Sequence, residues 1–591
     1  MYFYIMKIIT ATTAGFCMGV RRAVDIALEH AGKSESGVYT LGPLIHNNQT
    51  VQMLRERGIT ALDESKPPPP GSTILIRAHG VAPGVQRSWE PRGRVIDGTC
   101  PKVKTVHRVI EKYRALGFAI VITGDAGHAE VVGLQGYAGG AGHLIGSPEE
   151  VDKLPDFKKI CLVSQTTFDN VTFDKIAEKI RSRYAAGSEV VVKKTTCSAT
   201  DRRQDETREL AKKVDAMLVV GGKNSANTRR LAKIAAESGT PTQWVETEKE
   251  IEWDRIANCR TVGITAGAST PNWMIKRITD YLLYMDQTKK KTPANLLRYI
   301  IDHFSTVNIF VATGAALVYY ASCVLQELPP TVPGFALSFL YFLSMYLWNS
   351  LTSIEATQHL GVGRYRFYSA HKPALYAVVG VCILLILAIS FLESRLLFYL
   401  MLFSTFAGSV YHITIVPSSL RRIVRYGKLK DVPTSRDLFV ALAWGIVLTF
   451  VPLAGAGAHL SLITVPCFIL IFVLALLRSL IFDLRDIEGD RIMGRETLVT
   501  IIGEAWARKA VLVVIFLTGI VCALSPLFAA SANSLHVSEG FFLQMIPLLY
   551  LYVFMRFNRE HRISRSVLFN LLADGHFFLA GLCAWVAASV R

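Results

Sequence analysis

The chain has 591 residues, a hydrophobic fraction of 51% and a net charge of +17, averages that fit neither a purely soluble protein nor a simple membrane protein. The charge does not indicate nucleic-acid binding, because there is no basic helix or zinc-finger spacing and many positive residues flank apolar segments. The 10 cysteines are dispersed without a CxxC pair, which argues for a reducing compartment and against a disulfide framework. No cleavable signal peptide is recognised, and either Met1 or Met6 could be the initiator.

Residues 7–280 alternate between short β-branched runs and helical patterns. Runs such as STILIR, FAIVITGD and AMLVVGG end in small or polar residues, and segments such as VHRVIEKYRALG separate them. This alternation predicts parallel sheets with functional residues at the carboxyl ends of strands. Several strand ends carry hydrogen-bond donors and small residues suited to an anion: His79-Gly80, Asp125 to His128, Ser164 to Thr167, Gly222 to Ser225, and Ala266 to Ser269.

Three cysteines lie in comparable loops, in the segments GFCMG (Cys17), GTCP (Cys100) and TTCS (Cys197). Three thiolates from distant segments could hold a cubane iron-sulfur cluster and leave one iron without a protein ligand. One alternative is three buried structural thiols. Another is zinc, although CxxC pairs would be expected there. Cys161 and Cys259 are interpreted as a strand-core residue and a surface residue.

The order of motifs in this region resembles the 4-hydroxy-3-methylbut-2-enyl diphosphate reductases. The motifs are GFCMGV, LGPLIHN, RAHGV, DGTCPKV, GHAEVVG, SQTT, TTCSAT, GGKNSANTRRL and TAGAS. The resemblance implies three α/β subdomains around a cavity, with a 4Fe-4S cluster on Cys17, Cys100 and Cys197. It also implies a reaction in which two electrons and protons remove an allylic hydroxyl, giving isopentenyl and dimethylallyl diphosphates.

Within these motifs, Glu130 is the candidate proton donor, relayed through Thr166, because a carboxyl in a closed pocket can hold a proton near neutral pH. The candidate diphosphate ligands are His46, His79, His128, Ser225, Asn227 and Ser269. A single histidine in such a position is more often a structural residue than a ligand. Because all three histidines lie in motifs that match the family, the diphosphate-binding role is favoured over the structural one. Ala226 stands where the family often has a second serine, which removes one hydroxyl. The expected electron donor is a ferredoxin or flavodoxin.

The segment Tyr281 to Arg298 separates two kinds of sequence, and its Lys289 to Lys291 run would suit anionic headgroups at a cytoplasmic membrane face. The alternative is an ordinary solvated linker. We therefore expect a reductase domain over residues 1–285, a basic linker over 286–298 and a membrane domain over 299–591.

Nine apolar segments approach the length that crosses a bilayer, so the second half is expected to be an all-α bundle of about nine transmembrane helices. They lie near residues 300–323, 333–350, 373–392, 396–416, 435–453, 461–481, 509–529, 540–556 and 568–588. Basic residues recur after the second, fourth, sixth and eighth segments, which predicts that these loops lie in the cytoplasm with the reductase. The expected location is the bacterial inner membrane.

An acidic motif follows the sixth apolar segment. Asp483, Asp486 and Asp490 would share one helical face, and clustered carboxylates there call for a cation such as Mg²⁺. The alternative is a solvated acidic loop. With LKDVP at Leu429 to Pro433 and LFVALAWG at Leu438 to Gly445, the motif resembles UbiA-type membrane prenyltransferases. The resemblance implies a helical bundle in which Mg²⁺ holds a prenyl diphosphate for transfer to an acceptor.

The first acidic motif of that family is altered in this chain. Asn349 is present, but Ser353 and its neighbours replace the aspartates, and Glu355 supplies the one carboxylate. Either Asn349 and Glu355 hold a metal in a variant way, or this half binds prenyl diphosphates poorly, or it is a degenerate anchor or lipid-binding scaffold. Asp574 and His576 are interpreted as packing partners inside the bundle, with a role in acceptor binding left open.

Overall fold

The structure is a computed structural model that describes residues 6–31, 37–45, 47–62, 68–185, 187–289, 293–354, 362–411, 432, 434–493, 497–524, 535–558 and 567–590. The chain divides into two compact units, Met1–Thr279 (unit 1) and Asp280–Arg591 (unit 2). Helix α9 (Asn272–Lys289) runs through the boundary and α10 (Pro293–Thr306) follows it. Helices therefore extend into both ends of the expected linker.

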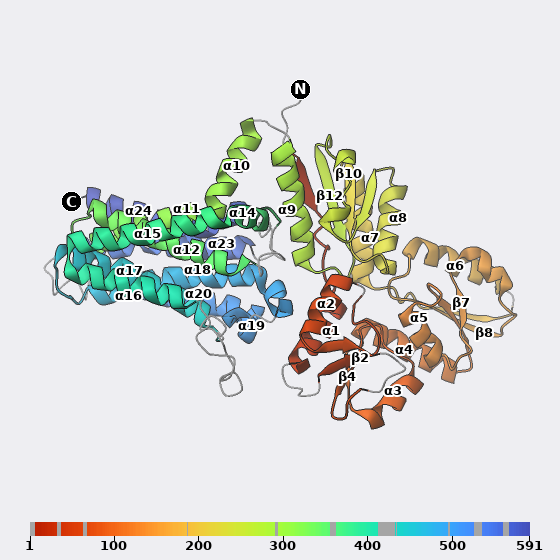
Figure 1. The fold of residues 1–591 in the computed structure, drawn as a ribbon. Helices are drawn as coiled ribbons and strands as arrows, with labels where there is room; N and C mark the ends of the chain where they lie inside the picture. Colours follow the sequence, from red (N-terminus) through yellow and green to blue (C-terminus); the bar gives the residue numbers. More distant parts are fainter. Residues whose placement is uncertain are drawn as a thin grey trace. The chain divides into compact units, whose positions relative to one another are not determined.

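Unit 1 contains three sheets of four strands, and all strand pairs in them are parallel (Figure 1). The first sheet has the order β1 (Lys7–Thr10), β12 (Thr261–Ala266), β10 (Ala216–Val220), β11 (Thr242–Val245). The second has the order β3 (Ile59–Ala61), β2 (Val38–Thr40), β4 (Thr73–Ile76), β5 (Arg94–Asp97). The third has the order β7 (His143–Ile145), β6 (Ala119–Thr123), β8 (Lys159–Ser164), β9 (Glu189–Val192). The predicted α/β architecture with three subdomains is confirmed.

Helices connect these strands. They are α1 (Met18–Ala31), α2 (Asn48–Glu56), α3 (Pro83–Trp89), α4 (Pro101–Ala115), α5 (Ala129–Tyr137), α6 (Asn170–Arg183), α7 (Ser198–Ala211) and α8 (Ala226–Glu237). The central strand β10 is buried at every position, as expected for a parallel strand covered on both faces. Apolar side chains of α6, including Phe173, Ile176 and Ile180, pack against Val121 and Leu162 of the third sheet.

The chain passes between sheets at three cysteines. Cys17 follows β1 and precedes α1, which leads to the second sheet; Cys100 follows β5 and begins α4, which leads to the third; Cys197 follows β9 and begins α7, which leads back to the first. In each case the strand before the cysteine lies at the edge of its sheet. The loops after the two central strands of each sheet contain the other candidate residues.

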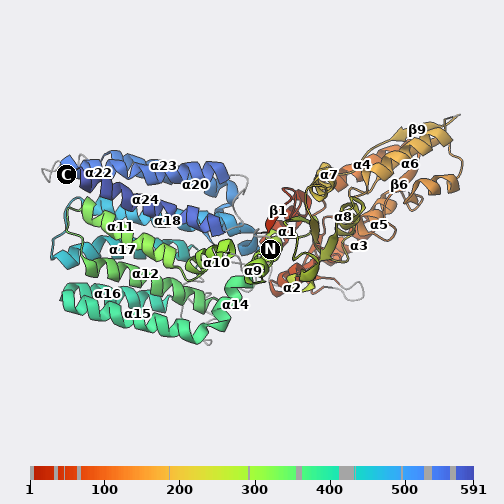
Figure 2. The same ribbon diagram turned by 90° about the horizontal axis from the view of Figure 1, so that it is seen from above.

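Unit 2 consists of helices, whose longer members run side by side (Figures 1 and 2). After α9 and α10 they are α11 (Ile309–Leu325), α12 (Val332–Thr352), α14 (Val362–Ala370), α15 (Lys372–Glu393), α16 (Arg395–Val410), α17 (Ser435–Ala456), α18 (Thr464–Met493), α19 (Leu498–Ile502), α20 (Glu504–Ala523), α22 (Leu535–Leu543), α23 (Met545–Phe557) and α24 (Val567–Ser589). Helix α11 packs against α12 and α24, and α17 packs against α18.

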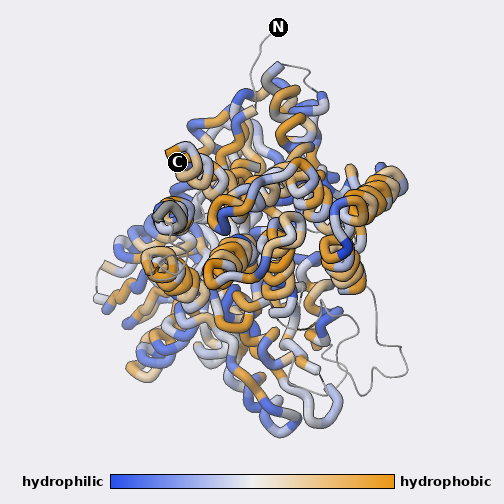
Figure 3. Tube along the Cα trace, turned by 90° about the vertical axis from the view of Figure 1, so that its left-hand side faces the viewer, coloured by the Kyte–Doolittle hydropathy of each residue, from blue (hydrophilic) through white to orange (hydrophobic). Residues whose placement is uncertain are grey.

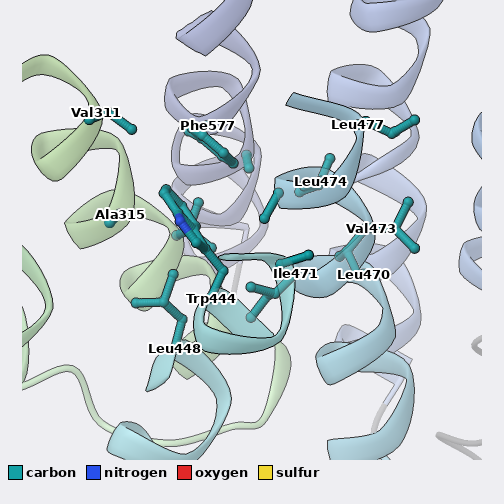
Figure 4. Close-up of a cluster of buried hydrophobic side chains, with 14 of the residues drawn as sticks. Val311, Ala315, Trp444, Leu448, Leu470, Ile471, Val473, Leu474, Leu477 and Phe577 are labelled. Carbon is teal, nitrogen blue, oxygen red and sulfur yellow. The ribbon is translucent and has the colours of Figure 1, made fainter. Parts of the chain in front are cut away.

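The interior of unit 2 is apolar, and so is much of its outer surface. Trp444 is fully buried and stacks on Phe577 with ring centroids 4.2 Å apart (Figure 4). Outward-facing side chains such as Phe391 and Leu392 of α15 are also apolar, and hydrophobic residues recur along the helices (Figure 3). An apolar exterior of this extent fits contact with lipid rather than water.

Among the described residues, six helices are long and apolar enough to cross a membrane, or seven if the bent pair Tyr299–Thr306 and Ile309–Leu325 forms one span. Helix α16 is apolar but shorter. Unit 2 is therefore a multi-pass membrane domain, and the predicted number of nine spans is not confirmed.

Candidate active sites

The three cysteine thiols lie at the starts of three helices and interact electrostatically. All three are free and half-buried, and the backbone N–H of Val20 donates to the Cys17 Sγ over 3.5 Å. Burial raises the pKa of the Cys100 thiol, backbone N–H groups of Lys102 and Val103 lower it, and charge on Cys17 and Cys197 raises it again. Three thiols at helix N-termini, whose charged forms would repel one another, favour a shared cation.

Gly19 allows the loops of Cys17 and Cys100 to approach closely. A Cβ at position 19 would lie 2.6 Å from the Cys100 Sγ and 3.0 Å from its Cβ. Any side chain there would displace the Cys100 thiol or the start of α1.

Helix α7 fixes the loop that carries Cys17. The buried guanidinium of Arg203 donates to the carbonyl oxygens of Ala266 (2.7 Å) and Gly15 (2.9 Å). The carboxylate of Glu206 accepts from the backbone N–H groups of Thr12 (2.6 Å) and Thr13 (2.9 Å), and from both threonine hydroxyls. Because α7 begins at Cys197, these contacts hold two of the three thiols in one rigid assembly. Arg203 and Glu206 were not identified from the sequence. Their position in the helix that follows Cys197 was the one feature of the sequence that could have indicated a role near the cysteines.

The donor set at the three crossovers fits an iron-sulfur cluster. Among the described residues, no three or more His, Cys, Asp or Glu side chains are placed so that together they could hold a metal ion. Nevertheless, three free thiols come from the edge strands of three sheets, receive backbone N–H groups and act on one another electrostatically. Such a set suits a cluster with one iron open to a ligand.

Glu130 and Thr166 form a buried pair beside Cys197. The backbone N–H and hydroxyl of Thr166 donate to the two carboxyl oxygens of Glu130 over 2.6 and 2.9 Å, and the Thr166 carbonyl accepts from the Cys197 N–H over 2.8 Å. Burial raises the pKa of Glu130 to about 7, and the bonds from Thr166 offset only part of this effect. A carboxyl next to a candidate metal ligand can thus carry a proton near neutral pH.

His128 caps α5 immediately before this carboxyl. Its Nδ1 accepts the backbone N–H of Glu130 over 3.2 Å, so in the neutral ring the proton is on Nε2 and can be donated elsewhere. The rings of His79 and His128 meet edge to face at 5.3 Å, which brings together the loops after β4 and β6. His46 lies outside the described residues.

The start of α8 is rich in buried donors. Ser225 caps the helix by accepting the N–H of Thr228 over 3.3 Å, which leaves its O–H as a donor. The Nδ2 of Asn227 is buried and has no acceptor among the described residues. Ser269 is also buried, in the loop after the neighbouring strand β12. A helix N-terminus with unused donors is suited to an anion such as a diphosphate.

Arg230 of α8 joins this helix to the third sheet. It donates to the Thr167 carbonyl over 2.6 Å and contacts the Asp125 carboxylate at 3.1 Å. The sequence analysis did not single out Arg230, although it identified both loops that Arg230 contacts. The donors of α8 are thereby placed next to the loops that hold Thr166 and His128.

In the membrane unit, the second acidic motif lies on α18 and faces an arginine of α17. Arg436 forms an ion pair with Asp483 and lies 3.7 Å from Asp437. Asp437, Asp483 and Asp490 are all buried. Both oxygens of Asp437 and the Oδ2 of Asp483 receive no hydrogen bond from the described residues. Buried carboxylate oxygens without donors fit a hard cation such as Mg²⁺, and Asp437 is a carboxylate that the sequence analysis did not identify.

The other predicted residues of this site have different surroundings. Asp486 is bound by its neighbour Arg485, with an Nη2–Oδ2 distance of 2.6 Å. Asn349 is half-buried near the end of α12, and Glu355 lies outside the described residues, so the proposed pair of these two residues stays a prediction. Ser350, beside Asn349, accepts a hydrogen bond from Arg364 over 2.9 Å.

Asp574 is buried and is the partner of a half-buried arginine. Arg478 Nε donates to Asp574 Oδ1 over 2.5 Å, and Arg478 Nη1 and Trp444 Nε1 both donate to the Tyr346 hydroxyl over 3.3 Å. The two ring nitrogens of His576 face the carbonyl oxygens of Ala573 and Leu474. These contacts agree with the interpretation of both residues as packing partners within the bundle.

Two family models match this chain: the LytB protein model over residues 8–283 and the UbiA prenyltransferase family model over residues 370–581. The chain is 43% identical over 274 residues to the 4-hydroxy-3-methylbut-2-enyl diphosphate reductase of Pelobacter propionicus, a match that covers 46% of this chain and 96% of that relative. It is 38% identical over 280 residues to the reductase of the same name from Clostridioides difficile, covering 47% of this chain and 99% of that relative.

For the second half, a structure of a UbiA homolog from Archaeoglobus fulgidus bound to GPP and Mg²⁺ is 16% identical, with a TM-score of 0.36, and the match covers 48% of this chain and 98% of that structure. Through its first half, the chain belongs to the LytB family of α/β reductases. It is an enzyme of the 4-hydroxy-3-methylbut-2-enyl diphosphate reductase type, followed in the same chain by a UbiA prenyltransferase domain.

Replacing Gly19 with alanine should reduce the iron retained by the full chain after anaerobic purification, because the new Cβ would overlap the Cys100 thiol. The matched control is Gly84→Ala, since a Cβ at Gly84 meets no atom within 4 Å. Iron content and iron-sulfur absorbance per chain are the measurements. Equal iron in both variants would contradict the close packing of the two loops.

The Glu130 carboxyl should destabilise the fold as the pH rises, because its pKa is raised from 4.5 to about 7. The stability that the protonated form contributes is fully present below pH 4.5 and is lost as the pH rises to about 7, by up to about 3 kcal/mol. Thermal unfolding of the wild type and of Glu130→Gln between pH 5 and 8 tests this. The variant should gain stability relative to the wild type across this range, and a difference independent of pH would refute the shifted pKa.

Proposed function

We propose that unit 1 reduces (E)-4-hydroxy-3-methylbut-2-enyl diphosphate to isopentenyl and dimethylallyl diphosphates, the last step of the non-mevalonate isoprenoid pathway. The observation that carries this proposal is the placement of a cysteine at each of the three crossings between sheets, in a chain whose relatives bear the name of this reductase. The reaction consumes two electrons and two protons and releases water.

Cys17, Cys100 and Cys197 are the residues that would hold a 4Fe-4S cluster. When bound, the cluster supplies the electrons and a Lewis-acidic iron for the allylic hydroxyl. Arg203 and Glu206 bind the Cys17 loop to α7, which limits how far this loop moves when its thiol binds. A ferredoxin or flavodoxin is the proposed source of electrons.

Glu130 provides the proton for the departing hydroxyl. It is buried and hydrogen-bonded to Thr166, and its pKa of about 7 keeps a substantial protonated fraction at neutral pH. Thr166 orients the carboxyl through two hydrogen bonds and can relay the proton through its hydroxyl. Water is excluded from the pair because both residues are buried.

Donors from all three sheets bind the diphosphate. His79 and His128 come from the second and third sheets, and Ser225, Asn227 and Ser269 come from the first; His46 is proposed on sequence alone. Hydrogen bonds to a charged oxygen are the stronger kind. The loss of one hydroxyl at Ala226 leaves the neighbouring donors of α8 in place.

Asn227→Ala should weaken substrate binding, because the buried Nδ2 loses its role as a donor to the diphosphate. A hydrogen bond to a charged group contributes about 1.5–3 kcal/mol, so KM should rise by about 10- to 100-fold while kcat changes less. The control Asn258→Ala changes an exposed residue in the segment that precedes β12. This segment lies at the amino ends of the strands of the first sheet, whereas Asn227 follows the carboxyl end of β10. Steady-state reduction by the full chain is the assay, and an unchanged KM would remove Asn227 from the site.

For unit 2 we propose transfer of a prenyl group from a prenyl diphosphate to an acceptor within the membrane. The unbonded carboxylate oxygens of Asp437 and Asp483 support a magnesium site between α17 and α18, to which Asp490 and, on sequence grounds, Asp486 contribute. Asn349 and Glu355 remain proposed for the altered first motif. When bound, Mg²⁺ would neutralise the diphosphate leaving group. The alternative is a catalytically inactive anchor or lipid-binding scaffold, favoured by the arginine that already pairs with Asp483.

The proposed location is the bacterial inner membrane with the reductase in the cytoplasm. Arg364 and Arg366 of α14, Lys372 at the start of α15 and Arg491 of α18 lie after the second and the sixth of the nine apolar segments predicted from the sequence. An excess of basic residues in alternate connections marks the cytoplasmic side. Both active units would then work on the same membrane face.

Asp483→Ala should lower prenyl transfer by about 100-fold or more, because it removes a carboxylate from the cation site. Membranes containing the full chain are supplied with a radiolabelled prenyl diphosphate and a lipid extract, and labelled lipid is counted. Glu393→Ala, which changes an exposed carboxylate at the end of α15, is the control. No transfer by the unchanged protein, or equal transfer by Asp483→Ala, would favour the scaffold.

A further inference from the structure

Helix α10 presents its large apolar side chains on its exposed side. Leu296 and Leu297 are each 60% exposed and Phe304 is 51% exposed, with Ile300 and Ile301 also exposed. Their spacing places them on one stripe of the helix. In water such a stripe would be buried against the rest of the protein.

The polar side chains of α10 contact the protein instead. Ser305 Oγ accepts a hydrogen bond from Asn570 of α24 over 3.3 Å, and Asp302 accepts one from Gln287. His303 lies at the border of the apolar stripe, seven residues after Leu296, and its ring meets Phe367 of α14 edge to face at 5.2 Å. The helix is therefore amphipathic in the reverse sense, with its polar side against protein and its apolar side outward.

A specific bend separates α10 from the first span. The axis turns by 64° before α11, a change of direction visible in Figure 1. Asn308 adopts a left-handed conformation with φ of 62° and donates to the Tyr368 hydroxyl over 3.3 Å, while that hydroxyl donates to the Thr306 carbonyl over 2.8 Å. The buried Tyr368 thus satisfies groups that the bend exposes, and such a conformation in a residue other than glycine persists only where its surroundings enforce it.

Positive charges lie next to this helix. Arg364 and Arg366 are exposed on α14, which packs on α10 through Phe367, and Lys372 is exposed just beyond it. Lys289 ends the helix that precedes α10. Apolar side chains flanked by basic residues are the features of helices that lie in an anionic headgroup layer.

We propose that α10 lies in the headgroup layer of the membrane that unit 2 spans, with its apolar stripe toward the acyl chains. The first span then begins at Ile309 rather than near residue 300, and its 17 residues extend about 26 Å. The lipid is the occupant of this face because the face continues directly into a membrane span and is flanked by cations. The helix fixes the depth at which the chain leaves the bilayer.

Photocrosslinking tests this placement in the full chain, reconstituted in nanodiscs of phosphatidylcholine and phosphatidylglycerol. The photoreactive residue p-benzoylphenylalanine replaces Leu296, Leu297 or Ile300 in separate proteins, and Asp302 on the opposite side of α10 is the matched control. Mass spectrometry should find phospholipid adducts at the apolar positions about tenfold more often than at Asp302, whose adducts should be with peptides of α9, because Asp302 accepts a hydrogen bond from Gln287 of that helix.

Three apolar positions are used so that one poorly folded variant does not decide the result. Adducts mainly with residues 1–279 or with a second copy of the chain at these positions would overturn the proposal. So would a lipid yield no higher than that of the Asp302 variant.

Discussion

Parallel strands cannot be joined by tight turns, so most strands of unit 1 are followed by a loop and a helix before the next strand begins. The carboxyl ends of the strands consequently collect irregular loops, and these loops contain the described candidate residues of the reductase site. The three cysteines follow edge strands because a chain that leaves one sheet for another does so at an edge. The proposed donors for the diphosphate follow the central strands. One topological constraint, repeated in three sheets, therefore separates the proposed metal ligands from the proposed anion ligands.

Buried charges determine how rigidly these loops are held. Arg203 is buried and bonded to two backbone carbonyl groups, and Glu206 binds the backbone of the same loop. A hydrogen bond to a charged group generally contributes about 1.5–3 kcal/mol, so these contacts hold the loop firmly. In unit 2, arginines have a similar role toward Asp483, Asp486 and Asp574. Both units thus use arginine to keep polar groups in place where water is scarce.

The sequence predicted the alternation of strands and helices, the strand-end loops and the three cysteines, because each of these features is local. The pairing of Glu130 with Thr166 could be anticipated from motif resemblance, and the structure brings the two side chains together. The contacts of Arg203, Arg230 and Asp437 could not be predicted, since each depends on segments distant in the chain. Hydropathy placed a span near residue 300 because it does not detect the bend at Asn308, which a tyrosine 60 residues later supports.

Iron and acid-labile sulfide per chain show whether three cysteines from three sheets hold one iron-sulfur cluster. The anaerobically purified full chain should contain one 4Fe-4S cluster. The single variants Cys17→Ser, Cys100→Ser and Cys197→Ser should each lose most of it, while Cys161→Ser, at a buried position in β8, should keep it. Full iron and sulfide in any of the first three variants would show that the cysteine replaced there does not hold the cluster. Bound zinc in the unchanged protein would show that the three thiols hold a different metal.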